Sequence, residues 1–93
     1  MSIKMTPNAV NKVQSMIEDN DLGDGYVVRV AVTATSSKLS YQLDIVDDVH
    51  DNDRSFDCGA VSIVVDPRSF LHLKGAVIDF NGGGFSFANP NEP

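Results

Sequence analysis

The sequence has 93 residues, 42% of them hydrophobic and 22% charged, which predicts a single globular domain over residues 1–93 and excludes a disordered, collagen-like or coiled-coil chain. Seven basic against thirteen acidic residues give a net charge of −6, which disfavours a nucleic-acid partner because a phosphate backbone repels an acidic surface. There is no apolar stretch long enough for a signal peptide or membrane span, and the single cysteine cannot form an internal disulfide, so we expect a cytoplasmic protein with no membrane partner.

The first predicted element is a helix over residues 6–20. Thr6 can cap its exposed amide groups, and Pro7 suits the first helical position. An apolar stripe at helical spacing follows, formed by Ala9, Val10, Val13 and Ile17. We therefore expect this helix to cover part of a hydrophobic core.

Two strands are predicted next, over residues 26–33 and 40–46. Valines alternate with polar or small residues in the first, and Tyr41, Leu43 and Ile45 alternate with polar residues in the second. The segment 34–39 between them predicts the loop of a hairpin.

The rest of the chain predicts three more strands and a second helix. Residues 47–59 are polar and are predicted to form a long connection, while the strand 60–65 has few polar positions and is expected to be central. A short helix over 66–75 is followed by strands 76–80 and 84–89 across a glycine-rich turn. The sequence thus predicts a mainly β (α+β) domain, shaped as a two-sheet β-sandwich or flattened barrel with an N-terminal helix and one short inserted helix.

The short helix has complete start and stop signals. Asp66 is its predicted cap, Pro67 lies in the first turn and Gly75 ends it. The predicted apolar face consists of Phe70, Leu71 and Leu73.

Cys58 is the candidate reactive thiol, in the turn that runs from residue 56 to residue 60. The adjacent carboxylate of Asp57 is expected to raise the pKa of the thiol and so to disfavour the reactive thiolate. A nucleophile also needs a base, and none is adjacent in sequence, although His50 or His72 could approach in space. An inert thiol is therefore favoured over a reactive one.

Other polar residues give no enzyme class. His72 is predicted to pack within the short helix, and His50 to be solvated. Glycines 82–84 precede neither a helix start nor a lysine, so they are predicted to be turn glycines and not a phosphate loop. Four aspartates form a predicted solvated loop, since they lack the ligand spacing of a calcium loop: Asp47, Asp48, Asp51 and Asp53. The sequence predicts no catalytic residue and no enzyme.

The end of the chain resembles a known family signature. Its last strand and the residues after it match the A-type iron-sulfur cluster carrier family (HesB/IscA-like) at Phe85, Phe87, Asn89, Pro90 and Asn91. Residues 1–17 resemble the first strand and helix of that family, and the strands and short helix that follow also resemble its pattern. The resemblance covers nearly the whole chain and implies a HesB-like fold and a role in iron-sulfur cluster assembly. It implies a structural role for the five matched residues.

The same resemblance implies three cysteine ligands, one in the loop after the first long strand and two in a Cys-x-Cys after the Asn-Pro-Asn. This sequence ends at Pro93 before such a pair, and its loop contains Thr35, Ser36, Ser37 and Lys38. Serine is a poor substitute, because its hydroxyl loses a proton at a far higher pKa and gives a hard oxygen donor. Cys58 lies away from these positions, and two subunits would bring two thiolates where a cluster takes four. We expect no metal site and no bound cofactor.

Three functions follow from this pattern. The favoured one is a non-catalytic, self-associating domain that acts in iron-sulfur cluster assembly through contacts with assembly components, recipient apoproteins or a ligand-bearing family member. The second is a structural or regulatory binding module unrelated to iron-sulfur chemistry. The third is a cluster carrier with a truncated C-terminal tail, which the loop serines disfavour because loss of a tail would not remove an internal cysteine.

Overall fold

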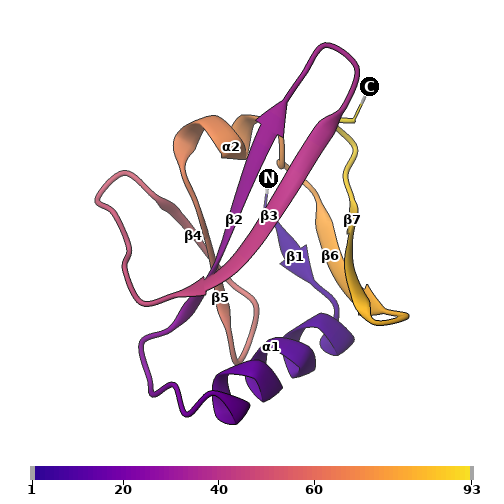
Figure 1. Cartoon of the computed structure of the whole chain (residues 1–93). Helices are drawn as coiled ribbons and strands as arrows, with labels where there is room; N and C mark the ends of the chain where they lie inside the picture. The colour runs from indigo at the N-terminus through magenta and orange to yellow at the C-terminus, as the bar shows by residue number, and fades with distance from the viewer. Residues whose placement is uncertain (1, 93) are drawn as a thin grey trace.

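The computed structural model describes residues 2–92, which form two β-sheets and two helices (Figure 1). The chain starts with a two-residue strand, β1 (Lys4–Met5), followed by the long helix α1 (Pro7–Asp19). The other elements, in chain order, are β2 (Val27–Ala34), β3 (Leu39–Val46), β4 (Arg54–Asp57), β5 (Ser62–Val65), α2 (Pro67–Leu71), β6 (Val77–Asn81) and β7 (Gly84–Ala88).

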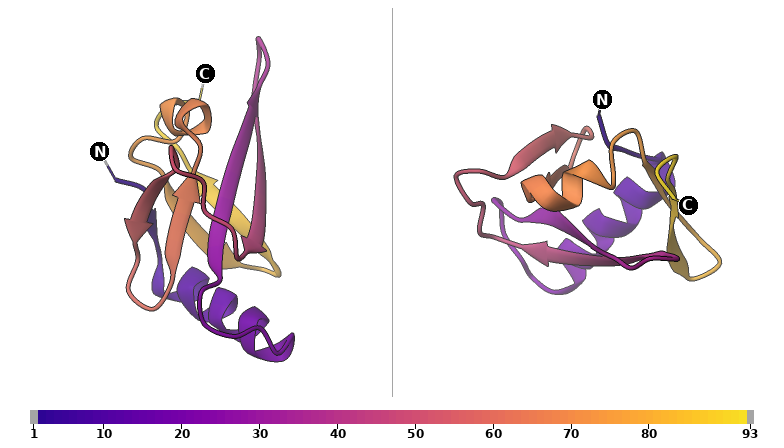
Figure 2. Two further views of the ribbon diagram at one scale, coloured as in Figure 1. Left: turned by 90° about the vertical axis from the view of Figure 1, so that its left-hand side faces the viewer. Right: turned by 90° about the horizontal axis from the view of Figure 1, so that it is seen from above.

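The strands form one sheet of order β1-β6-β7 and another of order β3-β2-β5-β4. Most neighbours are antiparallel, but β1 pairs with β6, and β2 with β5, in parallel. The molecule measures 39 × 34 × 20 Å, and its thin dimension fits two facing sheets about 10 Å apart (Figure 2). The predicted two-sheet sandwich or flattened barrel is confirmed.

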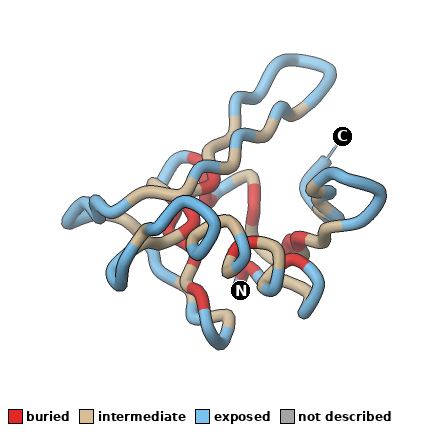
Figure 3. The backbone as a smooth tube through the Cα atoms, turned by 60° about the horizontal axis from the view of Figure 1, so that its bottom comes forward, coloured by how far each residue is buried: buried red, intermediate tan, exposed pale blue. Residues whose placement is uncertain are grey.

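The core lies between the sheets and includes residues of β2 and β5. Figure 3 marks the buried positions along the backbone in red. Val28, Val30, Ile63 and Val65 are fully buried there. Because β5 has β2 on one side and β4 on the other, it is an interior strand, as its near-continuous apolar sequence predicted.

Helix α1 begins as predicted. The Oγ1 atom of Thr6 accepts a hydrogen bond from the backbone N–H of Ala9 at 3.3 Å, and Pro7 occupies the first helical position. Ala9 and Val13 are fully buried, with Val10 and Ile17 packed beside them, so the predicted apolar stripe is the face that packs on β6 and β1.

The described residues contain seven strands, whereas the alternation of residues predicted five. The predicted connection 47–59 includes β4, in which only Phe56 is turned toward the core. A strand with one apolar residue carries no periodic signal, and it exists here because it pairs with β5. The second missed strand, β1, is too short for any pattern, although the family resemblance implied it.

Helix α2 is shorter than predicted, and its apolar face differs. It ends at Leu71, so His72 is its C-cap, and residues 72–75 form a turn. Phe70 and Leu73 are buried three residues apart, which points Leu71 outward, where 61% of it is exposed. The prediction that Leu71 belongs to the apolar face is therefore wrong.

The glycines after β6 have the predicted role. Gly82 and Gly83 adopt positive φ angles of 58° and 86° in the tight turn that connects β6 to β7. Neither helix in the described part of the chain is both long and apolar enough to cross a membrane.

Candidate functional site

The loop after β2 and the C-terminal segment lie at the same end of the molecule. Figures 1 and 2 place the tip of the β2–β3 hairpin, residues 35–38, and the segment 89–92 that follows β7 at the same end of the molecule. We call this end the hairpin pole, defined by these two segments. Both regions where the family resemblance implies cluster ligands therefore lie at this end.

The hairpin tip is an exposed, closed turn. The backbone N–H of Thr35 donates to the carbonyl of Lys38 at 2.9 Å, and the Oγ1 atom of Thr35 accepts from the N–H groups of Ser37 and Lys38. Thr35, Ser36, Ser37 and Lys38 are all exposed. The turn is held by the threonine side chain, and the two serines are presented to solvent.

Asn89 and Asn91 attach the C-terminal segment to the body of the domain. Asn89 Nδ2 donates to the carbonyl of His72 at 2.7 Å, and Asn91 Nδ2 donates to the carbonyl of Lys74 at 2.9 Å. Asn89 Oδ1 accepts from the backbone and side chain of Asn91, while Pro90 between them is exposed. The two asparagines of the Asn-Pro-Asn segment therefore bind the turn after α2.

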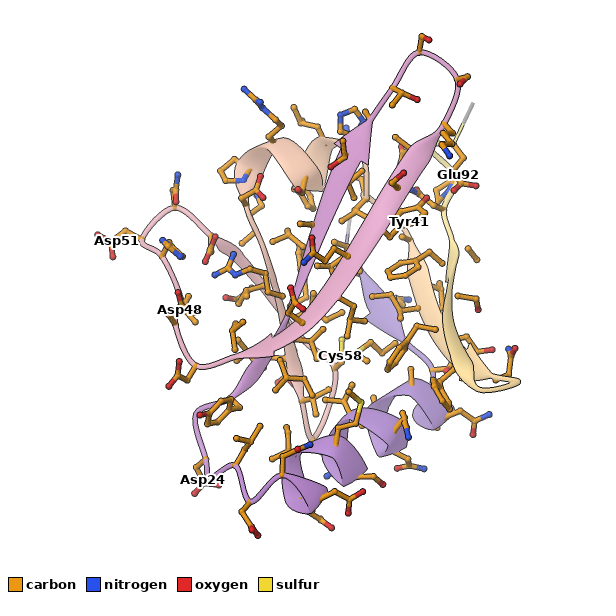
Figure 4. The ribbon with its side chains drawn as sticks, viewed as in Figure 1. Asp24, Tyr41, Asp48, Asp51, Cys58 and Glu92 are labelled. Carbon is orange, nitrogen blue, oxygen red and sulfur yellow. The ribbon has the colours of Figure 1, made fainter. Side chains whose placement is uncertain are left out.

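Tyr41 on β3 connects this segment to the larger sheet (Figure 4). Its ring stacks on Phe87 of β7, with centroids 4.4 Å apart and planes within 5°. Its hydroxyl accepts from Asn89 Nδ2 at 3.0 Å and donates to Glu92. Burial, aided by the Glu92 carboxylate, raises the pKa of Tyr41. This cluster joins β3 to β7, which are edge strands of different sheets.

Phe85 does not belong to this cluster. It forms an edge-to-face pair with Phe80 of β6, with ring centroids 4.9 Å apart. Lys12 of α1 lies over the Phe80 ring, with its Nζ atom 5.2 Å from the ring centroid. The two phenylalanines of the signature thus pack at different places along β7.

Replacing Asn89 by aspartate is expected to destabilise the domain by about 2 kcal/mol. The change keeps the acceptor oxygens but loses both donated bonds, and it puts a carboxylate against the carbonyl of His72. Urea unfolding monitored by circular dichroism measures the loss. Asn91→Ala is the control, since Asn91 is exposed and water can replace its partners. Equal effects of the two changes would contradict the proposed role of Asn89.

Cys58 is far from the hairpin pole. Figure 4 shows it in the middle of the molecule, apart from Tyr41 and Glu92. Its Sγ atom lies 3.9 Å from the carbonyl oxygen of Ile3, next to β1, and it packs against the core. It thus lies where β4 and β1, the remaining edge strands of the two sheets, approach each other, beside a groove of about 460 Å³ lined by residues 2–5 and 55–58.

The pKa of the Cys58 thiol is raised mainly by burial, and the negative charge of Asp57 raises it further. The prediction that this pKa is raised is confirmed, although the neighbouring carboxylate is only a secondary cause. A backbone hydrogen bond from Met5 acts in the opposite direction. Because the thiolate is disfavoured, this environment does not favour a nucleophile or a metal ligand.

The acidic loop 47–53 is fastened to the sheet by Asp53. Its carboxylate accepts two hydrogen bonds from Arg29, at 2.7 and 3.2 Å, and one from the backbone of His50. The exposed His50 ring lies 3.4 Å from Asp48. Figure 4 shows Asp48 and Asp51 extending outward from this loop. Among residues 2–92, no three His, Cys, Asp or Glu side chains are grouped so as to hold a metal ion.

With this geometry known, comparison with other proteins identifies the family. The chain matches the family described as "Iron-sulphur cluster biosynthesis" over residues 1–92. The chain belongs to this family. The iron-binding protein IscA of Serratia proteamaculans (strain 568) is 36% identical over 96 residues, which cover 98% of this chain and 88% of that protein.

Two solved structures of the iron-sulfur cluster biosynthesis proteins share the fold. Escherichia coli SufA, described as involved in biosynthesis of iron-sulfur clusters, superposes with a TM-score of 0.79 at 23% identity, covering 98% of this chain and 88% of that one. IscA with a [2Fe-2S] cluster gives a TM-score of 0.80 at 22% identity, covering 97% and 86%. The names of these family members describe iron binding and cluster biosynthesis, and not a catalysed reaction, in agreement with the prediction that the chain is not an enzyme.

Sequence reasoning did not find that Tyr41 of β3 bonds to Asn89 and Glu92 of the pole. The alternation in β3 predicts that Tyr41 faces the same way as Leu43 and Ile45, and the structure adds that its hydroxyl bonds to two residues of the C-terminal segment. An aromatic residue with a polar group on a half-buried strand is a weak signal of such a bond. The partner could not be inferred, because 51 residues separate Tyr41 from Glu92.

Proposed function

We propose that this protein is a non-catalytic member of the iron-sulfur cluster biosynthesis family that acts through protein contacts and does not hold a cluster by itself. Its partners in this proposal are iron-sulfur assembly components, recipient apoproteins or a cysteine-bearing relative. The observation that carries the proposal is the hairpin tip, where the residues at the implied ligand position offer hydroxyl oxygens.

The chemistry of the hairpin pole supports this view. Iron-sulfur clusters are held by thiolates, which bind iron tightly and still exchange. The side chains that the described pole offers are hydroxyls, amides, one ammonium group and the carboxylate of Glu92, which is already bonded to Tyr41. The oxygen atoms among them are hard donors and the ammonium group has no lone pair, so the residues present do not fit a cluster.

The position of Cys58 supports it further. To act as a ligand at the pole, Cys58 would have to leave its place between β1 and β4. There its thiol is half-buried and the pKa of the thiol is raised. Two copies of the chain would still contribute two thiolates, fewer than the four that a cluster takes.

The pole is suited to contact because it is exposed yet ordered. The turn at residues 35–38 is closed by hydrogen bonds of Thr35, and the segment 89–92 is bonded to the turn after α2. A surface held in one conformation loses little entropy when a partner binds. We therefore place the partner contact at this end of the molecule.

Anaerobic reconstitution tests whether the protein holds a cluster. The protein is mixed with ferrous iron and sulfide and then desalted, with a cysteine-complete A-type relative as the positive control. We expect the relative to keep its visible absorption and this protein to keep no stoichiometric iron. Cys58→Ser should behave identically. If the unmodified protein retained stoichiometric iron after desalting, at one or more iron atoms per chain, the proposal would be overturned.

Binding to purified partners separates contact in cluster assembly from an unrelated binding role. Scaffold protein, recipient apoprotein and the cysteine-bearing relative are each titrated with this protein by calorimetry. We expect at least one to bind, and the bulky change Ser37→Arg at the pole to weaken that binding, whereas Asp51→Arg on the distant acidic loop leaves it unchanged. Failure of all three to bind would favour an unrelated binding module, and equal effects of the two variants would refute the assignment of the pole.

A further inference from the structure

A second groove lies at the end of the molecule opposite the hairpin pole, beside α1 (Figure 1). It runs between the last turns of α1, the connection from α1 to β2 and the turn between β4 and β5, and has a volume of about 330 Å³. Since about 150 Å³ is enough to hold a benzene-sized molecule, this α1 groove has room for an aliphatic side chain. Its apolar lining is formed by Ile17, Leu22, Tyr26, Ala60 and Val61.

The rim of the α1 groove is acidic. Glu18 and Asp24 line it, and Asp19 and Asp21 are their neighbours in sequence. Residues 13–28 contain these four carboxylates and no lysine or arginine, and none of the four takes part in a salt bridge with another of residues 2–92. Two of them are in the last turn of α1, where the helix dipole already disfavours negative charge. The arrangement therefore suits an incoming positive charge.

The charge and shape of the groove exclude most occupants. A membrane surface or a nucleic acid is anionic and is repelled by the rim. A second copy of the chain carries a net charge of −6, so its overall field opposes its approach to this groove. The rim carboxylates are not grouped so as to hold a metal ion, a finding that applies to all of residues 2–92, and a small polar cation would leave the apolar lining unused. A basic polypeptide with an apolar side chain matches both features.

We propose that the α1 groove binds a segment of a partner protein in which an aliphatic side chain stands between lysines or arginines. The aliphatic side chain enters the groove, and the basic residues on either side of it lie near Glu18 and Asp24. Gln14 also lines the groove, and its amide can donate to and accept from a peptide group of the bound segment.

This contact goes beyond the proposed function, because it uses a different end of the molecule. Figure 4 shows Asp24 on the connection between α1 and β2, far from Tyr41 and Glu92 near the hairpin pole. One molecule can therefore hold a basic segment in the α1 groove while its pole contacts a different protein.

Fluorescence anisotropy of a labelled peptide tests the contact without iron or any assembly protein. The probe is a synthetic peptide in which one leucine stands between arginines, with glycine and serine elsewhere. We expect it to bind, and its affinity to fall as salt screens the charges. Replacing its leucine by serine should weaken binding at least about tenfold, because no apolar side chain then enters the groove. Replacing its arginines by glutamates should abolish binding.

Neutral variants of the rim separate local charge from net charge. Glu18→Gln combined with Asp24→Asn should weaken binding of the peptide about fivefold, because two exposed charge pairs are lost. Asp47→Asn combined with Asp51→Asn makes the same change of net charge on the exposed acidic loop and should leave the affinity nearly unchanged. Equal effects of the two pairs would show attraction to the acidic chain as a whole and would overturn the proposal.

Ala60→Phe tests the groove itself. Ala60 is exposed and lines the groove, so a phenyl ring fills the space without overpacking the core, and circular dichroism should show an unchanged fold. We expect this change to weaken peptide binding at least about tenfold. Ser36→Phe adds the same ring at the exposed hairpin tip and is the matched control, which should bind the peptide as the unmodified protein does.

Three further results would overturn the proposal. The first is a peptide that binds no better than its glutamate counterpart, or equally well to Ala60→Phe and the unmodified protein. The second is displacement of the peptide by spermidine at comparable concentration, which would identify a small organic cation as the occupant. The third is a lower mass of peptide-free Ala60→Phe in sedimentation, which would identify a second copy. Since these assays contain no iron and no assembly protein, their failure is distinct from failure of the proposed function.

Discussion

Replacing Arg29 by methionine is expected to lower the free energy of unfolding by about 3 kcal/mol, because it leaves a buried carboxylate without its counter-charge. The Asp53 side chain is 1% exposed, and its carboxylate accepts hydrogen bonds from both terminal nitrogens of Arg29. Arg29 also donates to the carbonyl of Asp48 at 3.1 Å, so the change frees the acidic loop from β2. Urea unfolding at pH 7 measures the loss.

The pH dependence identifies the cause. The hydrogen bond from Arg29 is the largest of the effects that hold the pKa of Asp53 below its usual value of about 4. Its stabilising contribution is therefore complete above pH 4 and is lost as the pH falls through the lowered pKa of the folded state. We expect the difference between the Arg29→Met variant and the unmodified protein to shrink toward pH 2. A difference that stays constant from pH 7 to pH 2 would show that packing, and not charge, is responsible.

Ile63→Ala is expected to destabilise the domain by about 3 kcal/mol through loss of buried methyl groups and the cavity left behind. Ile63 is fully buried on the interior strand β5, where Val28 of β2 and Phe56 of β4 are its neighbours across the sheet. Neighbours held on both sides by strand pairing cannot move far to fill the space. For a domain of this size the loss corresponds to a fall in melting temperature of roughly 12 to 24 °C.

Val49→Ala is the matched control for this prediction. It removes methyl groups from a β-branched residue that is 53% exposed, and we expect a change below about 0.5 kcal/mol. Differential scanning calorimetry of the three proteins, at a concentration where copies do not associate, gives both values. A similar melting temperature for Ile63→Ala and the unmodified protein would mean that β5 is not the centre of the core.

The fold could be predicted wherever the period of hydrophobic residues was long enough to read. The alternation in 40–46, the helical stripe ending at Ile17 and the near-continuous apolar run before Val65 each identified an element that the structure contains. Strand β4 could not be found in this way, because its state depends on pairing with β5. The sequence does not predict the exposure of Leu71, because its start and stop signals predict about two turns of helix where the chain forms little more than one.

Less of the candidate site could be predicted. The sequence and its family resemblance singled out the loop serines and the Asn-Pro-Asn segment, but neither indicates that Asn89 bonds to the turn after α2 or that Tyr41 joins the two sheets. Such contacts depend on how edge strands from different sheets meet, which residue patterns do not specify. The environment of Cys58 was hidden for the same reason, since its neighbour Ile3 lies 55 residues earlier in the chain.

The parallel pairing of β1 with β6 has a consequence during protein synthesis. Met5 pairs with Ile78, and the side chain of Thr6 bonds to that of Asp79, 73 residues later. The smaller sheet therefore cannot form until nearly all of these residues have left the ribosome, whereas the β2–β3 hairpin can form much earlier. Until then the apolar stripe of α1 has no β6 to pack against. The nascent chain therefore exposes a hydrophobic surface to which chaperones can bind.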